Sequence, residues 1–173
     1  VALSLSLTEP VPVAPQLAYV TAGGSTVPVT LSGGGAAWAG TLEISTGSDG
    51  PATFAFSATD VLGNVGASLT AGGSFVIMTV APGEPLFPRA IPQKAGAVRL
   101  SWSAPISGTP SSYSVYRDGV RLSSGIVPLA DGSGLFVDNP ADGSYTYAVS
   151  AVDAAGNESP QSTSVVATAK SVP

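Results

Sequence analysis

Residues 142–157 read DGSYTYAVSAVDAAGN, and residues 49–64 read DGPATFAFSATDVLGN. The two segments align without a gap at a separation of 93 positions, and nine of their residues are identical. Apolar side chains alternate with small or polar ones ahead of the second shared Asp, which is the pattern of a strand with one buried face. A repeat of this period is too long for a solenoid unit and is typical of a β-sandwich domain.

The repeat predicts two domains in a chain of 173 residues. The segment 81–85 contains two prolines in five residues, which makes a short and rather stiff connection. We therefore predict a first domain at residues 1–82 and a second at residues 83–173. Each is long enough to bury a core of its own.

Charge is scarce and unevenly distributed. Charged residues make up 10% of the chain, against about 25% in an ordinary soluble domain. The four charges before Gly83 are all acidic, whereas all six Lys and Arg residues follow it. The first half is thus predicted to present hydroxyls and backbone to water, or to be covered by neighbouring molecules. Nothing basic is concentrated enough to follow a phosphate backbone, so nucleic acid is not an expected partner.

The chain has no histidine and no cysteine. This excludes zinc sites built from those ligands, cysteine nucleophiles and every catalytic triad that uses histidine. No run of 18 apolar residues occurs, so no membrane-spanning helix is expected. The chain begins at Val1 without a charged segment ahead of an apolar one, and we interpret it as a processed or excised segment.

Strands are predicted throughout, because turn residues recur every 8–12 positions and no window shows a helical stripe. The Pro-rich segment 9–15 is predicted to be an extended edge or connector, and Gly33–Gly35 to end a strand. In the first half the predicted strands are 1–7, 17–20, 27–31, 38–44, 54–58 and 74–80. In the second half they are 98–102, 112–117, 120–122, 134–138, 145–152 and 163–168.

Residues 85–169 resemble a bacterial fibronectin type III domain. The motifs that carry the resemblance are VRLSW (98–102) followed by Pro105, YSVYRDG (113–119) and YTYAVSAVDAAGNES (145–159). The resemblance implies a seven-stranded sandwich, with Trp102 in the core and Tyr145 as a tyrosine corner whose hydroxyl bonds back to the backbone. The first half is similar to bacterial immunoglobulin-like repeats in its late strand and following turn. The expected fold is therefore all-β: two tandem immunoglobulin-like and fibronectin type III Greek-key sandwiches.

The two Asp-x-x-Gly-Asn turns are the best candidate sites. Asp60 and Asn64, or Asp153 and Asn157, offer oxygen atoms that could bind calcium. Each turn has a single carboxylate, however, and an Asp side chain can instead bind backbone N–H groups and shape the loop. We interpret both as structural turns. No metal ion, cofactor or catalytic residue is predicted, because the 11 acids stand one at a time in turns and suggest no carboxylate pair for hydrolysis.

Arginines and tyrosines of the second half are candidates for a binding surface. Arg99, Arg117 and Arg121 could form a basic patch, although exposed arginines of a sheet are more often paired with acids. Among the tyrosines, only Tyr116 falls on the face opposite a core residue, so a sugar-stacking platform has weak support. The hairpin turn Asp118-Gly119 is interpreted as an ordinary turn.

The uncharged, alternating segment Val1–Leu7 has two interpretations: the first strand of its own sandwich, or a strand that adds to the sheet of another copy. The sequence as a whole favours a non-catalytic extracellular or cell-surface structural protein, a subunit or spacer of a bacterial assembly or filament. Its expected partners are other copies of itself or neighbouring surface proteins. The alternative is an accessory region of a secreted polysaccharide-degrading enzyme, with polysaccharide as the partner.

Overall fold

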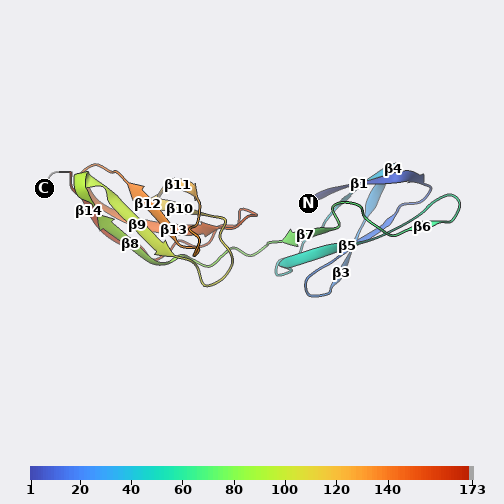
Figure 1. Cartoon of the computed structure of the whole chain (residues 1–173), viewed down its shortest axis with the longest axis horizontal. Coiled ribbons are helices and arrows are strands. Elements are labelled where there is room, and N and C mark those ends of the chain that lie inside the picture. Colours follow the sequence, from blue (N-terminus) through green and yellow to red (C-terminus); the bar gives the residue numbers. More distant parts are fainter. Residues whose placement is uncertain (172–173) are drawn as a thin grey trace. The chain divides into compact units, whose positions relative to one another are not determined.

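The computed structural model describes residues 1–171 and divides into two compact units, a first unit of Val1–Thr79 and a second unit from Val80 onward (Figure 1). Fourteen strands account for the regular structure of the described residues. The exception is η1, a single 3₁₀ turn at Lys94–Gly96. The all-β prediction is confirmed. No helix within residues 1–171 has the length and apolar character that crossing a membrane requires.

The second unit is a seven-stranded sandwich, as the resemblance implied. One sheet has the order β12-β9-β8 and the other has the order β11-β10-β13-β14, with all neighbours antiparallel. The strands are β8 (Leu86–Pro92), β9 (Val98–Ser103), β10 (Ser112–Arg117), β11 (Val120–Ile126), β12 (Gly134–Asp138), β13 (Gly143–Val152) and β14 (Val165–Ala169).

Aromatic side chains fill the core between these two sheets. Trp102, on β9, is 3% exposed and packs edge-on against Tyr113 of β10, with ring centroids 5.3 Å apart. Gly134 of β12 lies opposite Trp102 in the ladder and leaves room for the indole. The hydroxyl of Tyr145 donates to the carbonyl of Ala141 at 3.1 Å. Both predictions drawn from the resemblance, the core tryptophan and the tyrosine corner, are confirmed.

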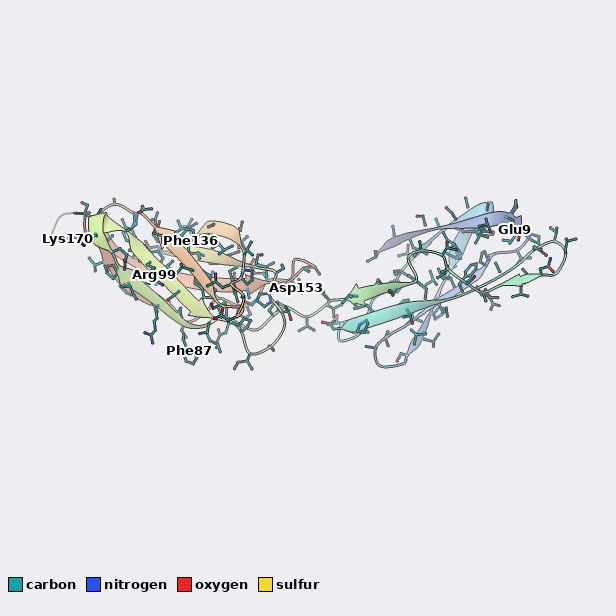
Figure 2. All side chains as sticks on the ribbon, in the orientation of Figure 1. Glu9, Phe87, Arg99, Phe136, Asp153 and Lys170 are labelled. Atoms are coloured by element: carbon teal, nitrogen blue, oxygen red, sulfur yellow. The ribbon has the colours of Figure 1, made fainter. Side chains whose placement is uncertain are left out.

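Strand β8 was not among the predicted strands, because its two prolines argue against a place inside a sheet. It lies at the edge of its sheet and pairs only with β9, which is where proline is tolerated. The register shifts between Leu86 and Arg89. Within this bulge Phe87 has a φ of 48°, and its side chain projects into solvent (Figure 2).

The first unit also has two sheets, but they are unequal. The larger one contains β3-β2-β5, and both β6 and β7 pair with β5. The smaller one contains only β1 and β4, so Val1–Leu7 pairs within its own unit. The strands are β1 (Ala2–Val11), β2 (Gln16–Val20), β3 (Thr26–Val29), β4 (Leu31–Thr41), β5 (Gly50–Thr59), β6 (Val65–Gly66) and β7 (Ser74–Ile77).

Strand β4 includes Gly33–Gly35, which the sequence predicts to end a strand, but the chain reverses direction at these glycines. Gly33 has a φ of 147°, and a side chain on it would meet the carbonyl oxygen of Ala37 at 2.4 Å. Gly35, at a φ of 61°, pairs with Val11 beyond a register shift in β1. The Ser32 hydroxyl donates to the carbonyl of Ala39 at 3.4 Å, and a side chain on Gly40 would meet the carbonyl oxygen of Thr30 at 2.8 Å. Residues 31–33 therefore lie against residues 37–40, and the glycines form a tight reversal within β4. Strand β1 likewise continues past the predicted end at Leu7, and β7 stops before the predicted end at Val80.

The repeated segment forms the central strand of the larger sheet in each unit (Figure 1). In the first unit β5 pairs with β2 on one side and with β7 on the other. In the second unit β13 pairs with β10 and β14 in the same way. The repeat therefore marks the same position in two related sheets.

Candidate functional site

The two Asp-x-x-Gly-Asn turns have the same internal hydrogen bonds. In the first turn Oδ1 of Asp60 accepts the backbone N–H groups of Leu62 and Asn64, both at 2.8 Å, and the Asn64 amide donates to Oδ2 at 2.7 Å. The glycine before the asparagine has a φ of 89° in both turns, a backbone conformation that favours glycine.

The turn after β13 repeats these contacts. Oδ1 of Asp153 accepts from the N–H groups of Ala155 at 2.9 Å and Asn157 at 2.8 Å, and the Asn157 amide donates to Oδ2 at 2.8 Å. Figure 2 labels Asp153 in this turn. In both turns the carboxylate therefore accepts hydrogen bonds from its own loop, as a structural turn requires. Within residues 1–171, no three carboxylates gather as a metal site would need.

These hydrogen bonds also lower the pKa of both aspartates. Burial raises the pKa of Asp153, but the hydrogen bonds from Asn157 and from the turn's backbone N–H groups outweigh it, so the pKa lies below its ordinary value. The pKa of Asp60 is lowered chiefly by the Asn64 side chain. Both carboxylates are therefore stabilised in the ionised form by the folded turn.

The aspartate that begins each copy of the repeat holds the end of a later segment. Oδ1 of Asp49 accepts the N–H of Thr79 at 2.8 Å, just after β7. Oδ1 of Asp142 accepts the N–H of Ser171 at 2.8 Å, just after β14. In both units this residue therefore fastens the chain that leaves the last strand.

Tyr116 lies in a polar network on the face of the larger sheet away from the core. Its hydroxyl donates to Oε1 of Glu158 and accepts from the guanidinium of Arg121, which lies over the ring at 5.4 Å from the centroid. Arg121 also forms an ion pair with Glu158, and the Ser150 hydroxyl donates to the same carboxylate. Tyr116 is 9% exposed. Its ring is covered, so it does not offer a sugar-stacking surface.

Arg117 is likewise engaged. It forms an ion pair with Asp138 at 2.7 Å, and the same carboxylate oxygen accepts the hydroxyl of the buried Tyr147 at 2.8 Å. The guanidinium lies 5.1 Å from the centroid of the Tyr145 ring. The interpretation that these arginines pair with acids is confirmed for Arg117 and Arg121. Arg99 lies on β9, in the other sheet, so the three arginines do not lie together on one sheet as a basic patch would require.

The first unit has two grooves that sequence reasoning missed. One, of about 530 Å³, lies along β1 and is lined by Leu5, Leu7, Phe56 and Leu69. Glu9 and Asp60 are the charged residues at its rim. The other, of about 560 Å³, is lined by Leu17, Val29, Leu31 and again Phe56. Alternation along β1 indicated a buried face, but nothing in the sequence showed that the face would stay partly open.

We expect the stability of the second unit to fall in acid. Hydrogen bonds from Ser150 and Tyr116 lower the pKa of Glu158 below its ordinary value of 4.5, with Arg121 contributing. A carboxylate with a lowered pKa stabilises the fold above its unfolded-state pKa, and that stability is lost as the pH falls through the folded-state pKa. Thermal unfolding followed by circular dichroism should therefore show a falling melting temperature as the pH is lowered from about 5 to 2.

The variant Glu158→Gln tests the cause of that fall. Because glutamine cannot ionise, the second unit of the variant should melt at a lower temperature than that of the parent at neutral pH. Its melting temperature should also fall less as the pH is lowered. Parallel pH profiles for the two proteins would show that the Glu158 network does not contribute to acid sensitivity.

Comparison with solved structures places these units in a known class of fold. The chain matches the fibronectin domains FN1–FN3 of chicken CNTN1 over 98% of its length and 60% of that chain, with a TM-score of 0.53 and 16% identity. It matches the fibronectin(III)-like modules of Clostridium thermocellum CbhA over 98% of its length and 85% of theirs, with a TM-score of 0.49 and 14% identity. The match to the CNTN1 domains shows that the chain has a fibronectin type III-like fold.

A further match to a solved structure covers only part of each chain. The match to the Clostridium perfringens spore cortex lytic enzyme SleM covers 52% of this chain and 29% of that enzyme, with a TM-score of 0.42 and 13% identity. The chain thus spans less than a third of that enzyme. No protein-family model matches the sequence, and no curated protein matches it.

Proposed function

We propose that the chain is a non-catalytic, extracellular structural protein: a subunit or spacer of a bacterial surface assembly or filament. The proposal rests on the contacts that the polar side chains of the chain make. The aspartates of both repeats hold turns and strand ends, and the arginines of the larger sheet are paired with acids. The side chains best suited to catalysis therefore stabilise the fold.

The surface of the first unit supports a role in packing against neighbours. Its acids are Glu9, Glu43, Asp49 and Asp60, and it has no Lys or Arg. A surface with so little charge does little to keep molecules apart. The fibronectin type III-like fold supports a modular structural role but does not by itself assign one.

In this proposal the two compact units act as consecutive domains, at residues 1–82 and 83–173. Tandem sandwiches joined by a short proline-containing segment can set a spacing between what lies before and after them. Other copies of the chain or neighbouring surface proteins are the proposed partners.

Electron microscopy of the native particle, together with sedimentation of the purified chain, tests the proposal. We expect the particle to be a filament or lattice, and the chain to associate as its concentration rises. A chain that sediments as a compact monomer and shows no association would remove the assembly role and leave a spacer.

We expect the chain not to bind insoluble polysaccharide, because Tyr116 is covered by Arg121 and its hydroxyl is engaged with Glu158. A pull-down with insoluble glycans should leave the chain in the supernatant, and Tyr116→Phe should behave identically. Retention of the parent chain that is lost in a folded Tyr116→Ala variant would instead favour the accessory region of a secreted enzyme.

A further inference from the structure

Two arginines of the second unit differ from the other two in having no acidic partner. Arg117 and Arg121 each form an ion pair. Arg89, on β8, and Arg99, on β9, are exposed, and neither forms an ion pair or a side-chain hydrogen bond with any residue in the described range 1–171. Their charges are therefore available to another molecule.

Both arginines lie on the outward face of the smaller sheet, β12-β9-β8. Val98 and Leu100, the inward residues of β9, are 0% and 2% exposed, so Arg99 between them points away from the core. The ladder places Ile91 of β8 on one side of Arg99 and Val137 of β12 on the other. Figure 2 labels Arg99 on this sheet.

The next row of the same face contains Arg89, Ser101 and Leu135. Arg89 and Arg99 are therefore diagonal neighbours on adjacent strands, where Cβ atoms lie about 7–8 Å apart. The one acid on these three strands, Asp138, lies on the inner side, opposite a buried valine. An anionic group from another molecule would thus stabilise both arginines at once.

Apolar side chains surround the two arginines on this face. Ile91, Leu135 and Val137 are each more than two-fifths exposed. The centres of protein interfaces are enriched in aromatic residues and arginine and depleted of Lys, Glu and Asp. We call this surface the arginine face, and its members are Arg89, Ile91, Arg99, Ser101, Leu135 and Val137.

Phe87, in the bulge of β8, adds an exposed aromatic ring that is held in a strained conformation. Its φ of 48° is uncommon for a bulky residue, and the residue before a proline normally prefers an extended conformation. The side chain is 75% exposed, so burial within the unit does not offset the strain. Residues held in this way are concentrated at binding and catalytic sites.

We propose that the arginine face, together with Phe87, binds the first unit of a second copy of this chain. The contact joins two different surfaces, and every copy carries both of them. Such a contact repeats from copy to copy and builds an open filament unless the rotation closes a ring. The inference rests on the proposed role as an assembly subunit and names the surface that assembles.

Charge complementarity favours the first unit as the occupant. All four of its charged side chains are acidic, and it has no Lys or Arg that the arginine face would repel. Asp49 and Asp60 accept hydrogen bonds within their own unit. Glu9 and Glu43 are exposed, and neither side chain has a hydrogen bond or ion pair within residues 1–171. These two glutamates are therefore available to the arginines.

The same charges disfavour a second unit as the occupant. Two arginine faces related by a two-fold axis would bring arginines against arginines, and like charges across an interface are strongly unfavourable. All six Lys and Arg residues of the chain lie in the second unit. The first unit is thus the better match within this chain.

Charge exchange between the two surfaces tests the proposal. The face variant combines Arg89→Glu with Arg99→Glu, and the first-unit variant combines Glu9→Lys with Glu43→Lys. All four side chains are exposed, so both proteins should fold normally. We expect sedimentation equilibrium of the full chain to show association of the parent and at least tenfold weaker association of each variant. An equimolar mixture should regain association, because opposite charges again meet at each contact.

Lys170 provides a control for the change in net charge. It is exposed, belongs to the second unit and lies outside β8, β9 and β12. Arg99→Glu alone should weaken association at least threefold, whereas Lys170→Glu, which changes the net charge equally, should leave it unchanged within a factor of about two. Circular dichroism melts verify that all variants fold.

The variant Phe87→Gly separates a role in binding from a role in the fold. Glycine adopts a positive φ without strain, so the second unit of the variant should melt no lower than that of the parent. Its association should nevertheless weaken at least threefold, because the exposed ring is lost. A lower melting temperature with unchanged association would show that Phe87 stabilises the fold and does not bind a partner.

Three results would overturn the proposal, and they bear differently on the proposed function. A parent chain that stays monomeric at all concentrations removes both the contact and self-assembly. Association that the face variant leaves unchanged removes the arginine face but leaves an assembly built through another surface. If the face variant weakens association and the first-unit variant does not, the face is a contact surface but the first unit is not its occupant.

Discussion

Replacing Trp102 with alanine is expected to lower the free energy of unfolding of the second unit by about 3–5 kcal/mol, which is typical when a buried tryptophan is truncated. The indole is almost fully buried and packs edge-on against Tyr113. Its Nε1 has no hydrogen-bond partner among the described residues, so the loss is one of packing and cavity formation. Denaturant unfolding followed by circular dichroism measures the change.

The chain offers a clean way to separate the two units in this experiment. Trp38 and Trp102 are its two tryptophans, one in each unit. In Trp102→Ala, fluorescence therefore follows the first unit alone, whereas circular dichroism follows both. Ile106→Ala is the control, because Ile106 is 89% exposed, and it should change stability by no more than about 0.5 kcal/mol. Equal effects of the two variants would show that Trp102 does not hold the core together.

Gly134→Ala is expected to destabilise the second unit by about 3 kcal/mol, at the upper end of the usual cost of overpacking. A methyl group on Gly134 would lie 2.3 Å from two atoms of the Trp102 ring, and the ring is enclosed by the core. The strand or the indole must move to relieve this contact. Thermal and denaturant unfolding of the purified variant measure the cost.

A double variant identifies the cause of that effect. Trp102→Phe removes the part of the indole that the new methyl group would meet. The free energy of unfolding should therefore fall less in the double variant than the sum of its decreases in the two single variants. Gly66→Ala serves as control, since a methyl group there has nothing within 4 Å, and it should cost no more than about 0.5 kcal/mol. Strict additivity of Gly134→Ala and Trp102→Phe would show that the indole is not the obstacle.

The features that could be predicted from the sequence are those that short segments specify. The alternation of apolar residues and the resemblance to fibronectin type III domains predicted two features. These are the position of Trp102 in the core and the tyrosine corner at Tyr145. The Asp-x-x-Gly-Asn turns were predicted as structural because one carboxylate can satisfy its own loop, and Asp60 and Asp153 do so. The tyrosine corner and both turns depend on residues at most a few positions apart.

What could not be predicted depends on partners far away in the chain. Strand β4 includes Gly33–Gly35, of which Gly35 pairs with Val11 of β1, although local glycine content argues against a strand. Strand β8 forms despite Pro88 and Pro92 because only one of its edges is paired. The groove along β1 is a property of the whole first unit, and no local pattern in the sequence reports it.

The pairing of β1 also has a consequence for how the chain folds during synthesis. In the first unit Ala2 pairs with Thr41, so β1 leaves the ribosome long before its partner exists. The edge of β1 that faces β4 then stays unpaired, and an uncharged strand of alternating leucines in that state is open to aggregation. Nascent chains that stop between β1 and β4 are therefore the ones that most need a chaperone.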